Sequence, residues 1–403
     1  MKRKKARKKK KSRRAKPDKI TDIAFWESLP EGLVHAISEK LPVVSVISMS
    51  KACKSWKQIL ASEDCSSQTR GLPWLMPCGQ NDSNNRSCVS VLQNKVCEMN
   101  IPEACGRYWW GSIEDWLILV ESCQSNSIKI CCLNPFLNTQ ILLPETLDVY
   151  SRIVLSTSPS EKNCVILLIS EFSPYIGCWT PEAKTWSKLY LEIGAIGDVV
   201  FCNGSFYFVN QDNDICIIEA TTVMNAIKGD NSVYEIQSQC SQVNMPDRTT
   251  WLRLRLHQYL VESCGQVLLV CCLCDFSNGE SWDTKSFEVF KLDVCQMTWI
   301  KMENLGDRLL FIGKCHSRSF SSKELGVDKG NCIYFLNDLP THQGNEWNQD
   351  TPLPSSLDDW GVFSLDSNSF HPESCKRGNA KSWPPIWMTA PSWWYIRNTP
   401  VPS

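Results

Sequence analysis

The sequence lacks any apolar run long enough to cross a bilayer, because a spanning helix needs about 18 or more apolar residues in a row. The longest apolar runs, Cys164–Ile169 and Val267–Cys274, have the length of buried strands. The charged N-terminus is not followed by the apolar segment of a secretory signal. We therefore expect a protein without membrane contact, whose 22 Cys are reduced and serve mainly as small core side chains.

Motifs of catalytic and metal-binding sites are also missing. The five His are scattered, and no Gly-rich phosphate loop or nucleophile elbow is present. Cys271 and Cys274 form one isolated Cys-x-x-Cys inside an expected strand, where alternation places the two thiols on opposite faces. We therefore expect a protein that is not an enzyme and holds no metal or other cofactor.

Charge is distributed unevenly along the chain. Residues 2–16 hold twelve basic side chains and no acidic one, and subtracting these from the 42 Lys and Arg leaves 30 against 43 Asp and Glu. We expect residues 1–20 to be a disordered arm that acts as a nuclear-import signal, which predicts a nuclear protein with the cytoplasm as a second location. A nucleic-acid arm and a solvating tail are the alternatives, but the arm has no aromatic side chain for base stacking. The signal residues are Lys2, Arg3, Lys4, Lys5, Arg7, Lys8, Lys9, Lys10, Lys11, Arg13, Arg14 and Lys16.

Residues 22–62 have helical spacing. Ser28 and Glu31 form a capping box that predicts the start of a first helix, and Leu33, Ile37 and Leu41 follow at i, i+4 and i+8. Pro42 ends this helix, because the residue before a proline avoids helical geometry.

A second helix is predicted after Pro42. Its apolar stripe consists of Val46, Met49, Cys53, Trp56 and Leu60, at spacings of three and four. A module of about 40 residues buries too little apolar surface to be stable alone. It therefore docks on the rest of the chain as a cap or finds a partner.

This module closely resembles an F-box. The resemblance rests on the order of Trp26-Glu27-Ser28-Leu29-Pro30, the two apolar helices, and Ala52-Cys53-Lys54-Ser55-Trp56 followed by Ile59. It implies that the helices bind a Skp-type adaptor and, through it, a cullin scaffold. The adaptor-binding residues that it implies are Leu29, Pro30, Leu33, Ile37, Leu41, Pro42, Val46 and Trp56.

The remainder of the chain has the pattern of a large β domain. We assign 63–90 to a linker and propeller entry and 91–403 to this domain, where short apolar runs alternate with turn residues. Val199–Cys202, Ser205–Asn210 and Ile215–Glu219 are predicted strands. Asn203-Gly204 suits a two-residue hairpin turn, because both residues accept positive φ.

Weak internal repeats point to a propeller. Leu-Val-Glu-Ser-Cys occurs at 119–123 and 260–264. In three places a polar turn residue follows a strand, and the first side chain of the next strand comes six residues later. The turn residues are Asn134, Thr180 and Asp293, and the first two lie 46 residues apart. A four-stranded blade takes about 40–50 residues. The predicted fold is therefore mainly β, with an N-terminal helical F-box followed by a six- or seven-bladed β-propeller.

The β domain also resembles a family. Leu72-Pro73-Trp74-Leu75, Asn134-Pro135-Phe136, the segment 307–313, Cys332–Phe335 and Gly361-Val362-Phe363 occur in the order found in plant F-box proteins of the KIB type. This resemblance implies a kelch-like propeller and a subunit of an SCF-type ubiquitin ligase. Trp383-Pro384-Pro385-Ile386-Trp387 and Pro391-Ser392-Trp393-Trp394, near the end of the chain, are expected to close the last blade; an exposed Pro/aromatic recognition segment is the alternative.

The function that follows is that of a substrate receptor. The F-box binds the Skp-type adaptor, and the propeller presents a protein substrate for ubiquitination without performing chemistry itself. Two alternatives remain open at this point. One is an F-box and propeller protein that sequesters a partner without degrading it, and the other is a nucleic-acid-associated factor acting through the basic arm.

Overall fold

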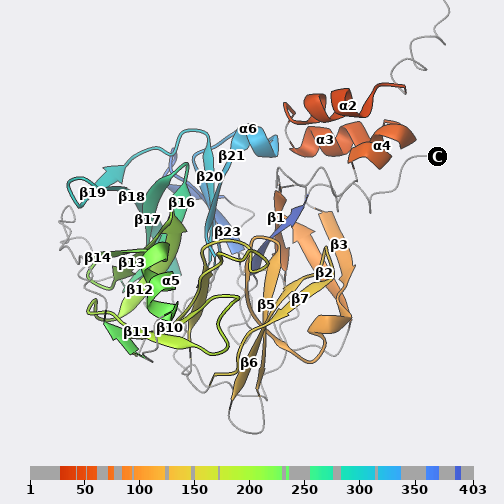
Figure 1. Ribbon diagram of the computed structural model, residues 1–403. Helices are drawn as coiled ribbons and strands as arrows, with labels where there is room; N and C mark the ends of the chain where they lie inside the picture. Colours follow the sequence, from red (N-terminus) through yellow and green to blue (C-terminus); the bar gives the residue numbers. More distant parts are fainter. Residues whose placement is uncertain are drawn as a thin grey trace, which may run out of the picture.

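The computed structural model describes residues 28–41, 43–50, 52–60, 71–76, 84–92, 95–122, 127–146, 150–170, 173–228, 233–235, 255–275, 283–313, 316–336, 360–371 and 386–391. The basic arm and Pro42 lie outside these residues. Within the described residues, three helices form the N-terminal module, and the rest is mainly strands (Figure 1).

The first helix of the module, α2 (Glu31–Ser38), begins later than the capping box predicted. Pro30 occupies the N-cap position with φ −57° and ψ 141°, and its own side chain makes no capping hydrogen bond. The prediction was wrong because it placed Leu29 inside the helix, whereas the residue before a proline is pushed out of helical geometry. The helix can therefore start only at Pro30 or beyond.

The second predicted helix is two helices. They are α3 (Val43–Ser50) and α4 (Lys54–Leu60), separated around Ala52 and Cys53. The break is stabilised at Cys53, whose thiol accepts a hydrogen bond from the Trp56 N–H at 3.4 Å, as an N-cap side chain does. The apolar stripe survives the break, because Val46 and Leu60 are both buried in one cluster.

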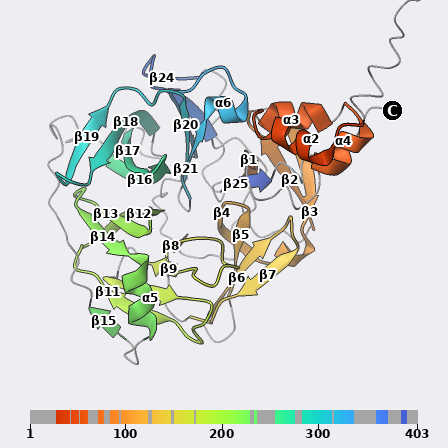
Figure 2. The same ribbon diagram turned by 45° about the horizontal axis from the view of Figure 1, so that its top comes forward.

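The strands form five hydrogen-bonded sheets among the described residues, set around a common centre (Figure 2). The first sheet contains β25 (Ile386–Pro391), β1 (Gly71–Met76), β2 (Asn85–Ser90) and β3 (Lys95–Asn100), and the short 3-10 helix Pro102–Ala104 follows β3. The second contains β4 (Tyr108–Ile113), β5 (Trp116–Ser122), β6 (Ile128–Asn134) and β7 (Thr139–Leu142). The third contains β8 (Arg152–Leu155), β9 (Ile166–Ile169), β10 (Tyr175–Trp179), β11 (Ser187–Tyr190) and β15 (Val233–Glu235).

The fourth and fifth sheets complete the circuit. The fourth contains β12 (Ile196–Cys202), β13 (Ser205–Asn210) and β14 (Ile215–Glu219), and α5 (Ala220–Lys228) follows it. The fifth has nine strands, in the order β19 (Thr298–Met302), β18 (Asp283–Asp293), β17 (Gln266–Asp275), β16 (Arg255–Ser263), β21 (Arg318–Ser321), β20 (Arg308–Ile312), β22 (Cys332–Leu336), β23 (Trp360–Ser364) and β24 (Ser369–Phe370). The short helix α6 (Ser322–Leu325) joins β21 to β22.

Residues from the two ends of the β domain share the first sheet. β25 pairs antiparallel with β1 along its whole length, from Gly71 opposite Pro391 to Met76 opposite Ile386. The expected closure by the C-terminal Trp/Pro segment is confirmed for the described residues 386–391. The sequence assigned 63–90 to a linker and propeller entry. Within that range β1 and β2 are already paired strands of the first sheet, so the β domain begins by Gly71.

The predicted hairpins near residue 200 are confirmed. β12 and β13 are joined by Asn203 and Gly204 with φ of 48° and 84°, and β14 has the predicted bounds. The arrangement of the domain is that of a propeller, mainly β with few helices. The prediction of six or seven blades is not confirmed by hydrogen bonding alone, because β21 and β20 connect the antiparallel sets β16–β19 and β22–β24 within one nine-stranded sheet.

The turn repeat corresponds to a structural repeat. Asn134, Thr180 and Asp293 each start the turn between the third and fourth strands of a set. The Asn134 and Asp293 side chains each accept two hydrogen bonds from backbone N–H groups two and three residues later, at 3.0 Å. The repeated Leu-Val-Glu-Ser-Cys segments, in contrast, are not equivalent: one lies in β5, a second strand, and the other in β16, a first strand.

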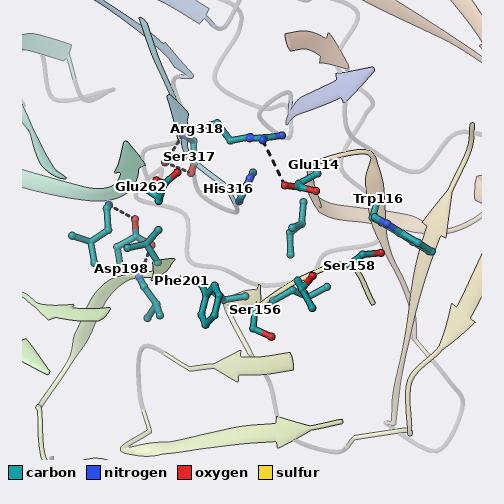
Figure 3. Close-up of a pocket in the computed structure, with 18 of the residues that line it drawn as sticks. Glu114, Trp116, Ser156, Ser158, Asp198, Phe201, Glu262, His316, Ser317 and Arg318 are labelled. Atoms are coloured by element: carbon teal, nitrogen blue, oxygen red, sulfur yellow. Dashed lines mark hydrogen bonds and ion pairs between the residues drawn. The ribbon is translucent and has the colours of Figure 1, made fainter. Parts of the chain in front are cut away.

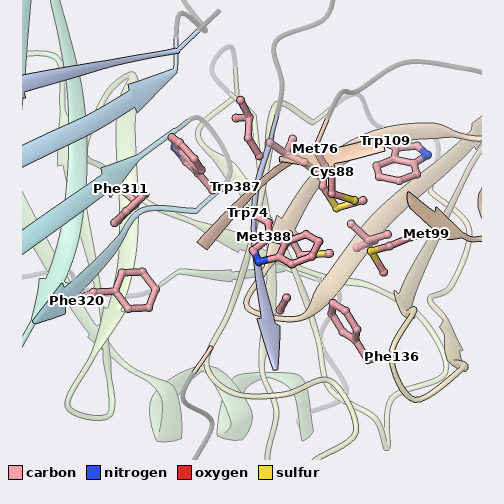
Figure 4. Packing of buried hydrophobic residues seen from close by; sticks show 14 of the residues in the cluster. Trp74, Met76, Cys88, Met99, Trp109, Phe136, Phe311, Phe320, Trp387 and Met388 are labelled. Atoms are coloured by element: carbon pink, nitrogen blue, oxygen red, sulfur yellow. The ribbon is translucent and has the colours of Figure 1, made fainter. Parts of the chain in front are cut away.

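The core consists of five apolar clusters, one of which joins the helices to the sheets. This cluster contains Val34, Val46 and Leu60 of the module together with buried aromatic side chains of the β domain. Figure 4 shows these aromatic side chains around β1 and β25, with Trp74 and Trp387 on the two paired strands. Most described Cys are buried, as expected for small core side chains.

Candidate functional site

The outer side of α2 is one of two features that stand out from the packed core. Leu33 is 52% exposed and Ile37 is 38% exposed, whereas Val34 between them is fully buried. Leu33 and Ile37 are four residues apart and therefore neighbours on one helix face. The helix thus turns one apolar face to the core and a second one to solvent.

The other predicted adaptor residues divide between surface and core. Pro30 is exposed, while Leu29, Leu41 and Trp56 are partly buried and pack against the cluster shared with the β domain. Val46 is only 7% exposed and belongs to that cluster, so it has little surface to offer a partner. The structure therefore brings Pro30, Leu33 and Ile37 to the surface and assigns the other four described residues to packing.

The inner side of the module is fixed to the β domain. α3 packs against α6, and Leu325 of α6 and Phe320 of β21 share the cluster with Val46. Figures 1 and 2 both place the three helices beside β1 and α6. The module thus docks on the β domain with one side. Its other side, with Leu33 and Ile37, is exposed and remains available for a partner.

The second feature is a cavity of about 190 Å³ between β4, β8, β12, β16 and β21 (Figure 3). Its volume is far above the roughly 10–15 Å³ that one water requires. Charged and polar side chains line it together with apolar ones, and the exposed Thr157 lies at its rim. The lining residues that matter for its chemistry are Glu114, Asp198, Glu262, His316 and Arg318.

Asp198 is neutralised by a buried ion pair. Its carboxylate pairs with the Arg152 guanidinium and accepts hydrogen bonds from the N–H groups of Val199 and Leu260, both at 2.7 Å. Burial raises the pKa of Asp198, and Arg152 opposes that shift. Because the carboxylate touches β8, β12 and β16, the pair connects three inner strands and contributes no net charge to the cavity.

The remaining charged side chains do not balance. An Arg318 nitrogen lies 3.5 Å from the Glu114 carboxylate, and another donates a hydrogen bond to the Thr389 hydroxyl at 3.1 Å. Glu262 accepts a hydrogen bond from the Gly265 N–H at 2.8 Å and has no ion-pair partner among the described residues. The lining therefore carries one carboxylate more than its cations compensate.

His316 adds a neutral imidazole. Burial, together with the neighbouring Arg318 charge, lowers the pKa of His316 to about 3, so the ring is uncharged at neutral pH. Its Nε2 is enclosed and has no hydrogen-bond partner within the described part of the chain. A buried nitrogen without a partner is costly, which indicates a place for a polar group.

Sequence reasoning missed this cavity. The signal was present in acidic residues that interrupt apolar strands, namely Asp198 within Ile196–Cys202 and Glu262 after Leu260 and Val261. A single such residue does not reveal which strands face each other, so only the closed ring of sheets brings them together.

The described residues contain no group of three or more His, Cys, Asp or Glu placed to hold a metal ion. Cys271 and Cys274 belong to different core clusters, which confirms that they face opposite sides of β17. Burial raises the pKa of Cys132, Cys178 and Cys271, so these thiols stay protonated at neutral pH. No helix in the described ranges is long and apolar enough to cross a membrane.

Comparison with known proteins decides the family. Residues 88–364 match the KIB1-4 beta-propeller, and residues 26–67 match the F-box domain. The chain belongs to the KIB1-4 beta-propeller family. The match covers more than half of the chain and includes the cavity, while the F-box match covers the three helices, so both predicted resemblances are confirmed.

The chain is also similar to curated plant proteins that are named as F-box proteins. An F-box/kelch-repeat protein of Arabidopsis thaliana is 24% identical over 308 residues, which cover 73% of this KIB1-4 family chain and 79% of the relative. A second F-box protein of Arabidopsis thaliana is 22% identical over 349 residues, covering 81% and 86%. The F-box protein SKIP23 of the same plant is 24% identical over 419 residues, covering 91% and 96%.

Proposed function

We propose that this protein is the substrate-receptor subunit of an SCF-type ubiquitin ligase. Its F-box binds a Skp-type adaptor and thereby a cullin scaffold, and its propeller binds a protein substrate for ubiquitination. The protein performs no chemistry itself; it raises the effective concentration of the substrate near the ubiquitin-carrying enzyme. The family and the F-box match support this role.

One observation carries the proposal. Leu33 and Ile37 present an apolar face on α2 while the opposite face of the same helix is anchored in the core. An apolar helix face with i, i+4 anchors is suited to docking in the groove of a partner. A helical cap that only covered the propeller would not need a second apolar face.

A binding measurement with purified full-length protein and a Skp-type adaptor tests the proposal. Leu33→Ala with Ile37→Ala should weaken adaptor binding at least about tenfold, because buried apolar anchors dominate such interfaces. Leu142→Ala is the matched control, since Leu142 is 69% exposed on the edge strand β7, away from the module. Equal affinity of the double variant and the wild type would remove α2 from the interface.

The finer architecture is also a proposal. We infer six blades, in which the nine-stranded sheet contributes two and each of the other four sheets contributes one. The set β16–β19 has four strands and the set β20–β24 has five, within the range of three to five strands in the other four sheets. An experimental density map that resolved a seventh set of strands would overturn this count.

We propose that residues 2–16, which lie outside the described residues, act as a nuclear-import signal. Their twelve basic side chains support this role. Deletion of residues 2–16 from a fluorescent fusion should move the protein from the nucleus to the cytoplasm, while adaptor binding stays unchanged. Continued nuclear accumulation of the deleted form would contradict the proposal, and so would loss of nucleic-acid retention with unchanged nuclear entry.

A further inference from the structure

We propose that the central cavity binds one organic cation, an alkylammonium or guanidinium group, and that the substrate protein supplies it as a Lys or Arg side chain. The first part rests on the cavity alone. The second part rests on the proposed function, because only a receptor of a protein substrate places such a side chain at the cavity.

The charge of the lining selects a cation. Asp198 is compensated by Arg152 and Glu114 by Arg318, but Glu262 has no ion-pair partner among the described residues. A carboxylate at a partly enclosed site attracts an opposite charge more strongly than one in bulk water, because the effective dielectric constant is lower. A ligand with a single positive charge would balance this one uncompensated carboxylate.

The hydrogen-bonding groups select a donor. Ammonium and guanidinium groups donate hydrogen bonds and accept none. The cavity offers them the Glu262 carboxylate, the hydroxyl of Ser158 and, in the Nδ1–H tautomer of neutral His316, the unpaired Nε2 as an acceptor. Figure 3 shows Glu262, His316 and Ser158 around the same space. An anionic ligand would meet Glu262 and Glu114, with only Arg318 in its favour.

The composition of the lining makes an organic cation a better fit than a metal ion. The described residues contain no cluster of three or more metal-ligating side chains. Trp116, Val200 and Leu260 line the cavity as well, and they suit the apolar stem of a Lys or Arg side chain. Exposure of Thr157 at the rim leaves the cavity open to a group entering from solvent.

The test uses the full chain and calorimetric titration at low ionic strength. The first two probes are Nα-acetyl-arginine amide and Nα-acetyl-citrulline amide, called arginine amide and citrulline amide below; the acetyl group removes the α-ammonium charge, and citrulline replaces the guanidinium by a neutral urea of the same shape. The third probe is a capped pentapeptide with one Arg among four Ala. We expect the wild type to bind arginine amide and the pentapeptide but not citrulline amide.

Two variants locate the binding. Glu262→Gln removes the charge while keeping an oxygen for the Gly265 N–H, and it should weaken binding of both cationic probes about 10- to 100-fold. The matched control is Glu288→Gln, which removes the same charge from β18, outside the cavity lining, where Glu288 pairs with Lys301 at 2.8 Å. This control should bind as the wild type does.

Each outcome is decisive. Absence of binding, equal binding of citrulline amide, or equal weakening by Glu262→Gln and Glu288→Gln overturns the cation site. Binding of arginine amide without the pentapeptide overturns a protein side chain as its source and assigns a small free amine instead. Adaptor affinity is measured on the same samples, so a protein that binds the pentapeptide but not the adaptor refutes the proposed function and leaves the cavity assignment standing.

Discussion

At the scale of single residues, the charged groups at the centre of the β domain determine how the fold responds to pH and to substitution. They lie on or beside the strands that line the cavity, where a buried charge needs a partner. Asp198 has three partners, the Arg152 guanidinium and the N–H groups of Val199 and Leu260. His316 needs no countercharge because its lowered pKa keeps the ring neutral. Glu262 lines the cavity. These three solutions lead to different predictions.

His316 should make the fold less stable in acid. Its folded pKa of about 3 lies below the ordinary value of 6.5. Between those values the unfolded chain binds a proton that the folded one does not, so the free energy of unfolding falls as pH drops from about 6.5 towards 3. The contribution of this residue is at most about 1.4 kcal/mol per pH unit.

Urea unfolding of the wild type and of His316→Asn between pH 7 and pH 5 measures this contribution. The variant should lose less stability over that interval than the wild type. His371→Asn is the control, because His371 is exposed at the end of β24. An identical pH dependence in all three proteins would show that the His316 ring is not kept neutral by the fold.

Arg152 should be essential for stability. Arg152→Met leaves the Asp198 carboxylate buried without its countercharge, and loss of one partner of a buried pair costs about 3–5 kcal/mol. Lys301→Met, which removes one partner of the partly exposed pair with Glu288, should cost less than about 1 kcal/mol. Similar losses in the two variants, measured by chemical unfolding, would contradict the structural role of the Arg152 pair.

At the scale of elements, β25 closes the ring of sheets. Trp387 on this strand is buried and donates a hydrogen bond from its indole N–H to the Ile312 carbonyl at 2.9 Å. Its ring also packs edge-on against the Phe311 ring, with 5.2 Å between the two ring centroids. It thereby links the first sheet to the fifth. Removing the Trp387 side chain should therefore lower the stability of the β domain where its first and last strands meet.

We expect Trp387→Ala to lower the free energy of unfolding by about 3–5 kcal/mol, the usual cost of deleting a buried Trp side chain. Val96→Ala, at a 69% exposed position on β3 of the same sheet, should change it by less than about 0.5 kcal/mol. Denaturant unfolding compares the two. A Trp387 variant as stable as the Val96 variant would mean that β25 does not hold the ring together.

Local patterns predicted elements well and element boundaries less well. The Asn203-Gly204 hairpin and the strands beside it were predictable because turn geometry depends on two neighbouring residues. The break at Cys53 was not, because the apolar stripe runs through it without interruption and only the thiol hydrogen bond marks the new helix start. The nine-stranded sheet was not predictable either, since β21 pairs with β16 across more than fifty residues of chain.

The same distinction applies to the candidate sites. The F-box residues follow one another in the sequence, so their resemblance to a family was visible, but periodicity could not separate exposed Leu33 from buried Val46. The cavity residues come from strands and connecting loops that are distant in sequence, and only the closed ring brings Glu114, Glu262 and His316 together.

At the scale of the whole molecule, the helical module and the β domain of the proposed receptor are held together rather than tethered. The module shares its core cluster with the β domain, and α3 packs on α6. A substrate on the propeller would therefore keep a fixed position relative to an adaptor on α2. Fixed geometry favours transfer by proximity, because the effective concentration depends on how narrowly the two sites are held.

The most direct test of this account is co-purification of the full chain with a co-expressed Skp-type adaptor and cullin. We predict that the wild type retains both proteins through gel filtration and that Leu33→Ala with Ile37→Ala loses both while eluting as a folded monomer. A wild-type chain that elutes folded but without the adaptor would contradict the receptor role, and the three helices would then be only a cap on the propeller.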